Sequence, residues 1–319
     1  MPLSKEEQQY MENQLDRCDE ALADKVVLAS VFDAEWRRAF RVNVLSADRM
    51  EDIGCPTAYA ATMTIYREWL PADYQSRLEE GAEVLLPKLC DADENGLISR
   101  LRGPGCVSAE EELLLVRSFA LEFGKNAIVG PQGNASQTRP EFMVLVNGLE
   151  IAIEAKGLLD SENIRLHWQA ARFVGHNYWV SPFDTTDQDL KRVEHAIKKK
   201  IQQVSAVGSG IIVFTQYTAW PPADMTVNLM RRMVLEPSTY GIDDPHAVLA
   251  VGYVGYRLIQ GVWFNPHAAE QCCIESVLRD RLRKALRDSF YPRPDGVFFD
   301  EAMDEESHRA MLDKMHDRH

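Results

Sequence analysis

The sequence lacks the features that mark membrane, secreted and zinc-binding proteins. No uninterrupted apolar run approaches the roughly 20 residues that a bilayer crossing needs. The first residues do not form a basic segment followed by an apolar one, as a secretory signal would. The six cysteines include no Cys-x-x-Cys pair, and no histidine spacing suggests zinc. We therefore expect a soluble cytoplasmic protein with reduced thiols and no membrane partner.

An excess of positive charge is also absent. The 319 residues include 35 Lys and Arg against 49 Asp and Glu, for a formal net charge of −14. Such a chain repels nucleic acid at long range, so any contact with nucleic acid must be local. Basic residues concentrate in two stretches, Lys191 to Lys200 and Arg279 to Arg287.

The strongest local signal lies between Arg139 and Lys156. Asn147-Gly148 separates two apolar runs, and both central residues of a type I′ turn need positive φ, which Asn and Gly adopt readily. We therefore predict strand, turn, strand. Counting outward from the turn places Glu141 directly opposite Glu154. The same register gives three further pairs: Val146 with Leu149, Val144 with Ile151, and Phe142 with Ile153.

This register brings two carboxylates together. Directly opposed residues have Cβ atoms about 4.5–5.5 Å apart, and like charges at that distance repel. Side chains alternate along a strand, so Lys156 shares the face of Glu154, while Ile151, Ile153 and Ala155 face a core. A divalent cation would remove the repulsion, and we expect the pair to require a bound ion. The alternative is an exposed hairpin with a solvated charged face.

The hairpin resembles the PD-(D/E)XK nuclease superfamily, with Pro140-Glu141 at the first half of the motif and Glu154-Ala155-Lys156 at the second. The resemblance covers roughly residues 107–218, and it departs from the family in having Glu141 where Asp is usual. It implies an α/β (mixed) fold, namely a restriction-endonuclease-like core with a central mixed β-sheet flanked by helices. An N-terminal helical region would be added to this core.

The resemblance also implies a metal-dependent nuclease that hydrolyses phosphodiester bonds, with DNA favoured over RNA and endonuclease over exonuclease. The implied cofactor is Mg²⁺ or Mn²⁺, and the implied ligands are Glu141, Glu154, the carbonyl of Ala155, and Glu112 from the first core helix. Lys156 would stabilise developing negative charge, and we expect nearby carboxylates to keep it charged. The alternative is a degenerate module that binds nucleic acid or a protein partner without cutting. Cutting both strands would suit a homodimer.

The choice of Glu112 depends on a predicted helix that ends near Phe123. Ser108 and Glu111 form a capping box at its expected start. Glu112 lies on the apolar stripe of this helix, where an acid is costly unless it is paired. The alternative role for Glu112 is a first-turn acid that stabilises the helix dipole. A short strand is predicted next, from Lys125 to Val129.

A second helix is predicted from about Gln188 to Val204, followed by a strand at residues 211–215. With the hairpin, these elements give a β-α-β order. The predicted buried face of the helix consists of Leu190, Val193, Ile197, Ile201 and Val204. Its other faces carry Lys198 and Lys199, candidates for phosphate contact, and Gln202 and Gln203, which the resemblance allows to reach the active site. The alternative is a solvated helix face.

An aromatic and basic segment precedes this helix. Arg165, His167 and Arg172 are candidate substrate contacts there, because cations and rings together can stack on bases or bind a backbone. The alternative is that the rings pack over a core edge. Farther along we predict a helix at 227–235, strands at 247–253 and 258–264, and a helix at 269–290.

Three domains are predicted: a helical N-terminal region at 1–104, the nuclease-like core at 105–265, and a C-terminal helix with an acidic tail at 266–319. Gly103-Pro104-Gly105 marks the first boundary. Asp91 to Ser99 imitates the opening of an EF-hand loop, but Arg102 stands where a bidentate Glu is needed. We interpret this stretch as an interdomain turn, with a calcium site as the alternative. The N-terminal helices and the acidic tail are candidate docking elements for a protein partner.

Overall fold

The computed structural model describes residues 3–48, 58–59, 73–103, 105–131, 139–158, 186–205, 208–216, 223–240, 248–254, 259–265, 268, 275–289 and 297–300. Contacts divide these residues into two compact units. One unit contains the chain up to Arg117, and the other contains Ser118 to Leu158 and the described residues from Thr186 onward. Among all these residues, none of the helices combines the length and the apolar character that a membrane crossing requires.

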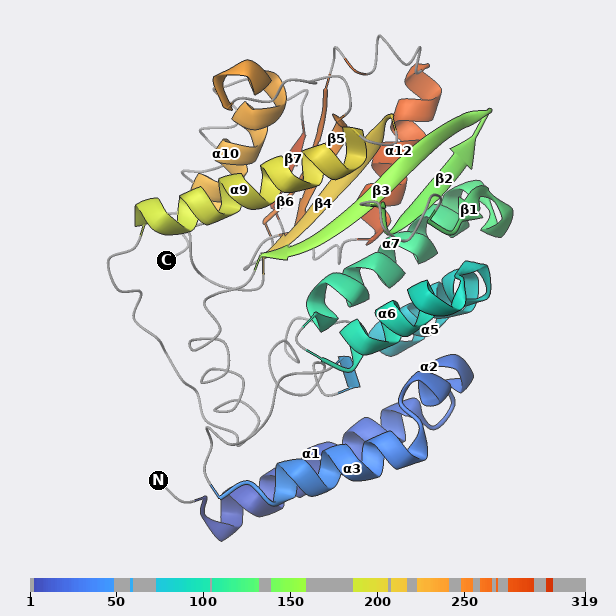
Figure 1. Ribbon diagram of the computed structural model, residues 1–319, viewed down its shortest axis with the longest axis vertical. Helices are drawn as coiled ribbons and strands as arrows, with labels where there is room; N and C mark the ends of the chain where they lie inside the picture. The colour runs from blue at the N-terminus through green and yellow to red at the C-terminus, as the bar shows by residue number, and fades with distance from the viewer. Residues whose placement is uncertain are drawn as a thin grey trace. The chain divides into compact units, whose positions relative to one another are not determined.

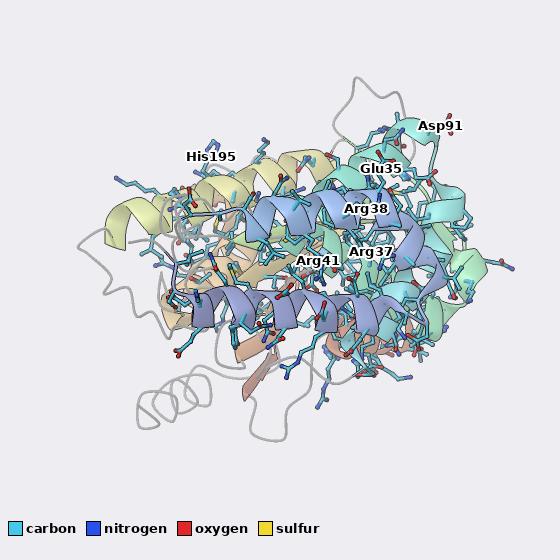
Figure 2. The ribbon with its side chains drawn as sticks, turned by 90° about the horizontal axis from the view of Figure 1, so that it is seen from below. Glu35, Arg37, Arg38, Arg41, Asp91 and His195 are labelled. Carbon is cyan, nitrogen blue, oxygen red and sulfur yellow. The ribbon has the colours of Figure 1, made fainter. Side chains whose placement is uncertain are left out.

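The first unit is helical, as predicted for this region. Its elements are α1 (Lys5–Leu22), α2 (Val26–Val31), α3 (Ala34–Leu45), α5 (Tyr74–Leu85), the 3₁₀ turn η2 (Leu86–Lys88), α6 (Asp91–Leu101) and the first part of α7 (Cys106–Phe123). The helix α1 begins at a capping box, in which Ser4 N donates to Glu7 Oε2 at 2.6 Å. Arg37 and Arg41 extend from α3 toward α1 (Figure 2), where they pair with Asp19 and Asp16.

The interpretation of residues 91–99 as an interdomain turn was wrong, because these residues open α6. Cys90 is the N-cap residue, and the first helical turn carries Asp91, Asp93 and Glu94. Negative charge is stabilised at this end of a helix by the helix dipole. The same acids that imitate a calcium loop therefore favour a helix start, and a helical backbone excludes the EF-hand loop.

The predicted start of α7 was also displaced. The helix begins at Cys106, and Ala109 N donates to the carbonyl of Gly105 at 3.2 Å. Ser108 therefore lies inside the first turn and does not cap the helix. The turn at Gly103 to Gly105 sets this earlier start, since Cys106 N also donates to the carbonyl of Gly103 at 3.1 Å.

The second unit contains one seven-stranded sheet whose strands follow the order of the chain (Figure 1). The strands are β1 (Ile128–Val129), β2 (Phe142–Val146), β3 (Leu149–Leu158), β4 (Gly210–Gln216), β5 (Val248–Val254), β6 (Ile259–Phe264) and β7 (Val297–Asp300). Three neighbouring pairs are parallel, β3 with β4, β4 with β5, and β6 with β7, and the other three are antiparallel. The sheet is therefore mixed, and the predicted α/β class is confirmed.

The hairpin of β2 and β3 has the predicted register. Phe142 pairs with Ile153, Val144 with Ile151, and Val146 with Leu149. Asn147 and Gly148 have φ values of 52° and 80°, as the two central residues of a type I′ turn require.

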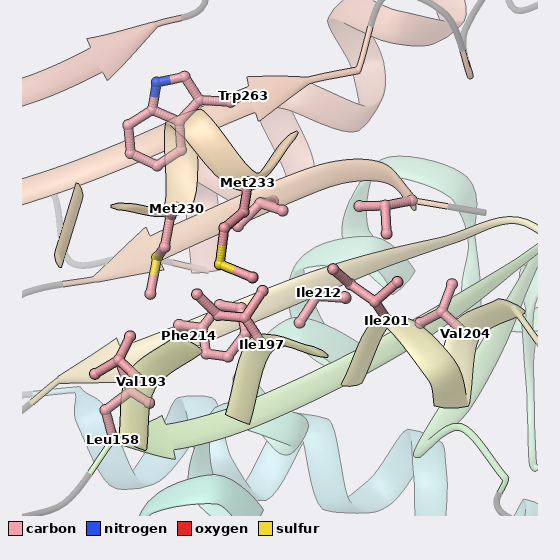
Figure 3. Packing of buried hydrophobic residues seen from close by; sticks show 12 residues of the cluster. Leu158, Val193, Ile197, Ile201, Val204, Ile212, Phe214, Met230, Met233 and Trp263 are labelled. Carbon is pink, nitrogen blue, oxygen red and sulfur yellow. The ribbon is translucent and has the colours of Figure 1, made fainter. Parts of the chain in front are cut away.

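Helices cover both faces of the sheet. On one face lie α9 (Thr186–Ser205) and α10 (Ala223–Leu235), which bury a shared apolar cluster against β4, β5 and β6 (Figure 3). The buried face of α9 includes four of the five predicted residues, Val193, Ile197, Ile201 and Val204, and Leu190 is half-buried. On the other face, Phe119 of α7 contacts Phe142 edge-on, with ring centroids 6.3 Å apart. The helix α12 (Ser276–Ser289) joins α7 there, where Arg281 Nε lies 2.7 Å from Glu122 Oε1.

Two further predictions need correction. Residues 125–127 form the 3₁₀ turn η3 (Lys125–Ala127), so the strand predicted for residues 125–129 is limited to β1. The acidic tail expected after residue 295 contains β7, which pairs with β6 in parallel. Its run Val297-Phe298-Phe299 is apolar and aromatic, as strands favour. The predicted helix at 269–290 corresponds to α12, and residues 269–274 lie outside the described part of the chain.

Candidate functional site

The hairpin brings Glu141 and Glu154 to one place on the sheet. Glu141 directly precedes β2, so the register of the hairpin extended by one pair sets it beside Glu154 on β3. Glu141 Oε2 accepts a hydrogen bond from Ala155 N at 3.3 Å, which orients this carboxylate along the edge of β3. Glu154 is completely buried, whereas 12% of the Glu141 side chain is exposed. The two acids therefore form a site that is closed on the side of the core and open at Glu141.

A lysine from α9 lies between the two carboxylates. Lys200 Nζ is 3.2 Å from Glu141 Oε1 and forms a short ion pair with Glu154 Oε2. Only 13% of the Lys200 side chain is exposed. An ammonium group of the chain itself therefore lies between the two acids, and the expectation of a bound metal ion stays a prediction.

Sequence reasoning missed Lys200, although a signal for it was present. The residue follows Ile197 by three positions and precedes Ile201 by one, and both of these isoleucines are buried on the face of α9 that covers the sheet. A long side chain on the flank of such a face can reach back over the sheet. Lys198 and Lys199, which we had singled out, lie farther around the helix.

Burial and charge shift the protonation of this site. Burial raises the pKa of Glu154, and Glu141 raises it further through a hydrogen bond and its charge. Burial lowers the pKa of Lys200, but Glu141 and Glu154 outweigh this effect and hold its pKa above the ordinary value. The two directions are compatible if Glu141 stays ionised beside Lys200 while Glu154 takes up a proton.

One oxygen of Glu154 stands out. Glu154 Oε1 is buried and has no hydrogen-bond partner among the described groups, whereas Oε2 contacts Lys200. A buried carboxylate oxygen costs free energy if it has no hydrogen-bond donor. A ligand that supplies positive charge or a proton at this oxygen would remove that cost.

Lys156 lies on the same face of β3 as Glu154, two residues farther along. Its side chain is half-buried, and burial, followed by the charges of Lys200 and Lys199, lowers its pKa, while Glu141 opposes the shift. The expectation that carboxylates keep Lys156 charged was therefore wrong in direction, because burial and two lysines outweigh one acid. Lys156 loses a proton more readily than an ordinary lysine does.

Glu112 lies in the first unit. It is 2% exposed, and its Oε2 is 2.6 Å from Arg100 Nη2. This ion pair supplies the partner that an acid on an apolar stripe needs. Its assignment to a metal shell stays a prediction.

The remaining candidate contacts have different surroundings. Lys198 Nζ lies 2.6 Å from Glu194 Oε1, and Lys199 is exposed. Gln203 is half-buried, and its Oε1 has no partner in the described part of the chain. The side chain of Gln202 is not among the described ones, and three predicted contacts, Arg165, His167 and Arg172, lie outside the described residues.

The donor set suits a small hard cation. Among the described residues, no group of three or more His, Cys, Asp and Glu side chains is placed to hold a metal. Mg²⁺, however, commonly binds proteins through one or two carboxylates and keeps several of its waters. Glu141 and Glu154 offer such a pair, with one buried oxygen unpartnered. The residues therefore fit Mg²⁺ or Mn²⁺, provided that Lys200 gives up its position.

Comparison of the chain with models of protein families, with curated proteins and with solved structures finds no match. The chemistry of the site must therefore be inferred from its own residues. These are two convergent acids, one ammonium group between them, and a second amine whose pKa is lowered.

Proposed function

We propose that the protein is a metal-dependent nuclease of the PD-(D/E)XK type, which hydrolyses phosphodiester bonds in DNA in preference to RNA. The observation that carries the proposal is the convergence of Glu141 and Glu154 at the open end of the hairpin, with Lys156 on the same face of β3. The order of β3, α9 and β4, in which β3 and β4 are parallel neighbours, supports a restriction-endonuclease-like core.

The proposed roles follow from charge and position. Glu141 and Glu154 would hold Mg²⁺ or Mn²⁺, with the carbonyl of Ala155 as a further oxygen ligand. When bound, the cation would supply Lewis-acid stabilisation of the negative charge on the scissile phosphate. Lys156 would stabilise the same charge as an ammonium group. Glu112 stays a candidate for a further ligand.

The direct test is cleavage of plasmid and linear DNA with Mg²⁺ or Mn²⁺. We expect wild-type protein to cut in the presence of either metal and Lys156→Ala to lose about a hundred- to a thousandfold in rate, as when one charge-stabilising group is removed. Lys25→Ala is the matched control, because Lys25 pairs with Asp24 in the first unit and lies outside the acid pair. Absence of cleavage with both metals, or equal rates for Lys156→Ala and wild type, would contradict the proposal.

Lys200 favours a second function, binding of nucleic acid or of a protein partner without cutting. An ammonium group that already offsets the acid pair reduces the need for a metal. This function predicts DNA binding that is unchanged by chelating agents, measured by fluorescence anisotropy, together with no cleavage under any metal condition. Metal-dependent cleavage that Lys156→Ala abolishes would exclude it.

A further inference from the structure

The position of Lys200 bears on how a metal would enter the proposed site. Its ammonium contacts one oxygen of each acid, Glu141 Oε1 and Glu154 Oε2. The two remaining oxygens of the acid pair differ. Glu141 Oε2 accepts a hydrogen bond from Ala155 N, whereas Glu154 Oε1 has no partner among the described residues. The ammonium thus occupies the place between the carboxylates that a shared cation would take.

We propose that Lys200 is a positioning residue that holds Glu141 and Glu154 together in the metal-free protein and is displaced when a divalent cation binds. The proposal rests on the proposed function for the identity of the cation. It goes further by assigning Lys200 a role in the resting state of the site, as a competitor of the metal.

Charge balance favours displacement over coexistence. One ammonium brings a single positive charge to the acid pair, whereas a divalent cation brings two. An ammonium and a divalent cation between the same two acids would repel each other strongly in a buried place. The side chain of Lys200 can leave, because a lysine has a flexible four-carbon stem and 13% of this side chain already meets solvent.

The test compares Lys200→Met with wild type in binding Mn²⁺, measured by isothermal titration calorimetry. Methionine keeps an unbranched apolar stem and removes the charge. We expect Lys200→Met to bind Mn²⁺ at least about tenfold more tightly, because the metal no longer competes with a charge-assisted contact. Lys198→Met, on the same helix but paired with Glu194, should bind Mn²⁺ as wild type does. Equal or weaker binding by Lys200→Met would overturn the proposal.

Thermal unfolding gives a second readout that a merely structural lysine would not produce. Without metal, Lys200→Met should melt at a lower temperature than wild type, because the two buried acids then lose the ammonium group that contacts both of them. Excess Mn²⁺ should restore most of the loss in Lys200→Met and should raise the melting temperature of wild type much less. A loss that Mn²⁺ does not restore would overturn the proposal.

If Lys200→Met fails to fold without metal, the double variant Lys200→Met/Glu141→Gln replaces it. The neutral amide removes one charge of the acid pair, and one carboxylate remains, so this variant should fold, and it should bind Mn²⁺ more tightly than Glu141→Gln alone does. Equal or weaker binding by the double variant than by Glu141→Gln would contradict displacement. These tests measure Mn²⁺ binding and stability, whereas the proposed function is tested by cleavage. If wild type cleaves DNA but binds Mn²⁺ as tightly as Lys200→Met does, only the role of Lys200 is overturned. Absence of Mn²⁺ binding in all variants overturns both this role and the proposed function.

Discussion

Two buried glutamates, one in each unit, have opposite surroundings. Glu79 of α5 is 7% exposed, and its two oxygens accept hydrogen bonds from Val27 N and Leu28 N, both at 2.7 Å. These donors belong to the first turn of α2, whose N-cap residue forms no side-chain capping bond. Glu154 is completely buried, but it shares one ammonium with a second acid and leaves Oε1 unpartnered among the described groups.

The difference separates a structural acid from a candidate functional one. Glu79 belongs to α5 but caps the start of α2, because it accepts hydrogen bonds from backbone donors that α2 cannot satisfy internally. Nothing remains for a ligand to do there. Glu154 is stabilised less well than its burial demands, and a catalytic role or a bound ion is among the explanations for such an incompletely paired group.

The largest effect should appear in the cleavage rate when Glu154 and Glu79 are each neutralised in a separate variant. We expect Glu154→Gln to lose about a hundred- to a thousandfold in metal-dependent cleavage, because the proposed site loses one of two charged ligands. Glu79→Gln should cleave DNA at the wild-type rate. Cleavage rates on one plasmid substrate at saturating metal make the comparison. Similar losses for both variants would show that the distinction between the two acids has no functional meaning.

Glu110 challenges the comparison, because it too is buried with Oε1 unpartnered in the described chain, yet no ammonium lies beside it. The pKa of Glu110 is raised to about 8, because burial and the charge of Glu111 raise it more than a hydrogen bond with Tyr74 lowers it. Such an acid can hold its own proton near neutral pH, so it needs no cation. What distinguishes Glu154 is the second acid and the shared lysine.

This assignment predicts a pH dependence of stability. Between the ordinary pKa of 4.5 and about 8, folded Glu110 binds its proton more tightly than the unfolded chain does. The free energy of unfolding should therefore fall as the pH rises through this window, on the order of 5 kcal/mol in total. Glu110→Gln should flatten the profile, because a neutral amide has no proton to lose. Urea denaturation from about pH 5 to pH 8.5 measures it.

Glu154 contributes to the same profile, since its pKa is also raised. The double variant Glu110→Gln/Glu154→Gln should therefore be flatter than Glu110→Gln alone. A profile for Glu110→Gln that still falls as steeply as that of wild type would show that Glu110 is ionised in the folded protein.

At neutral pH, the two variants should rank in the opposite order for stability: Glu79→Gln should lose more unfolding free energy than Glu154→Gln, although Glu154→Gln loses more cleavage activity. We expect Glu79→Gln to lose about 1.5–3 kcal/mol, because an amide nitrogen cannot accept the hydrogen bond that one carboxylate oxygen now accepts. Glu154→Gln should change stability by less than about 1 kcal/mol, since glutamine resembles the protonated form that burial favours. Urea denaturation at neutral pH measures both variants. A larger loss for Glu154→Gln would make it the structural acid of the two.

Local patterns predicted much of the second unit. The register of the hairpin follows from Asn147-Gly148, because the turn counts the pairs on both sides. The buried face of α9 follows from its helical period, and β4 to β6 follow from short apolar runs. Each of these features depends on residues that are close together in the sequence.

The failures had causes beyond local pattern. The pairing of Lys200 with Glu141 spans 59 residues, and only the packing of α9 on the sheet sets it. The pKa of Lys156 depends on burial and on lysines from that same helix. The start of α6 fits two local patterns, a calcium-binding loop and the first turn of a helix, because both are rich in acidic residues. A motif specifies which groups can act, but tertiary contacts decide which charges they meet.

The smallest effects should come from the exposed lysines of α9, and they test whether burial or charge alone makes Lys200 special. Lys199→Met should lower DNA affinity modestly and equally for all sequences, and should reduce the slope of log affinity against log salt by about 1, as expected for one phosphate contact. Lys198→Met should cost at most about 0.5 kcal/mol of stability, because its bond to Glu194 is a half-exposed i,i+4 pair. Neither variant should change Mn²⁺ affinity, since neither ammonium lies between the two acids. If either one tightens Mn²⁺ binding as Lys200→Met does, then the total positive charge of α9, and not the buried position of one lysine, controls the site.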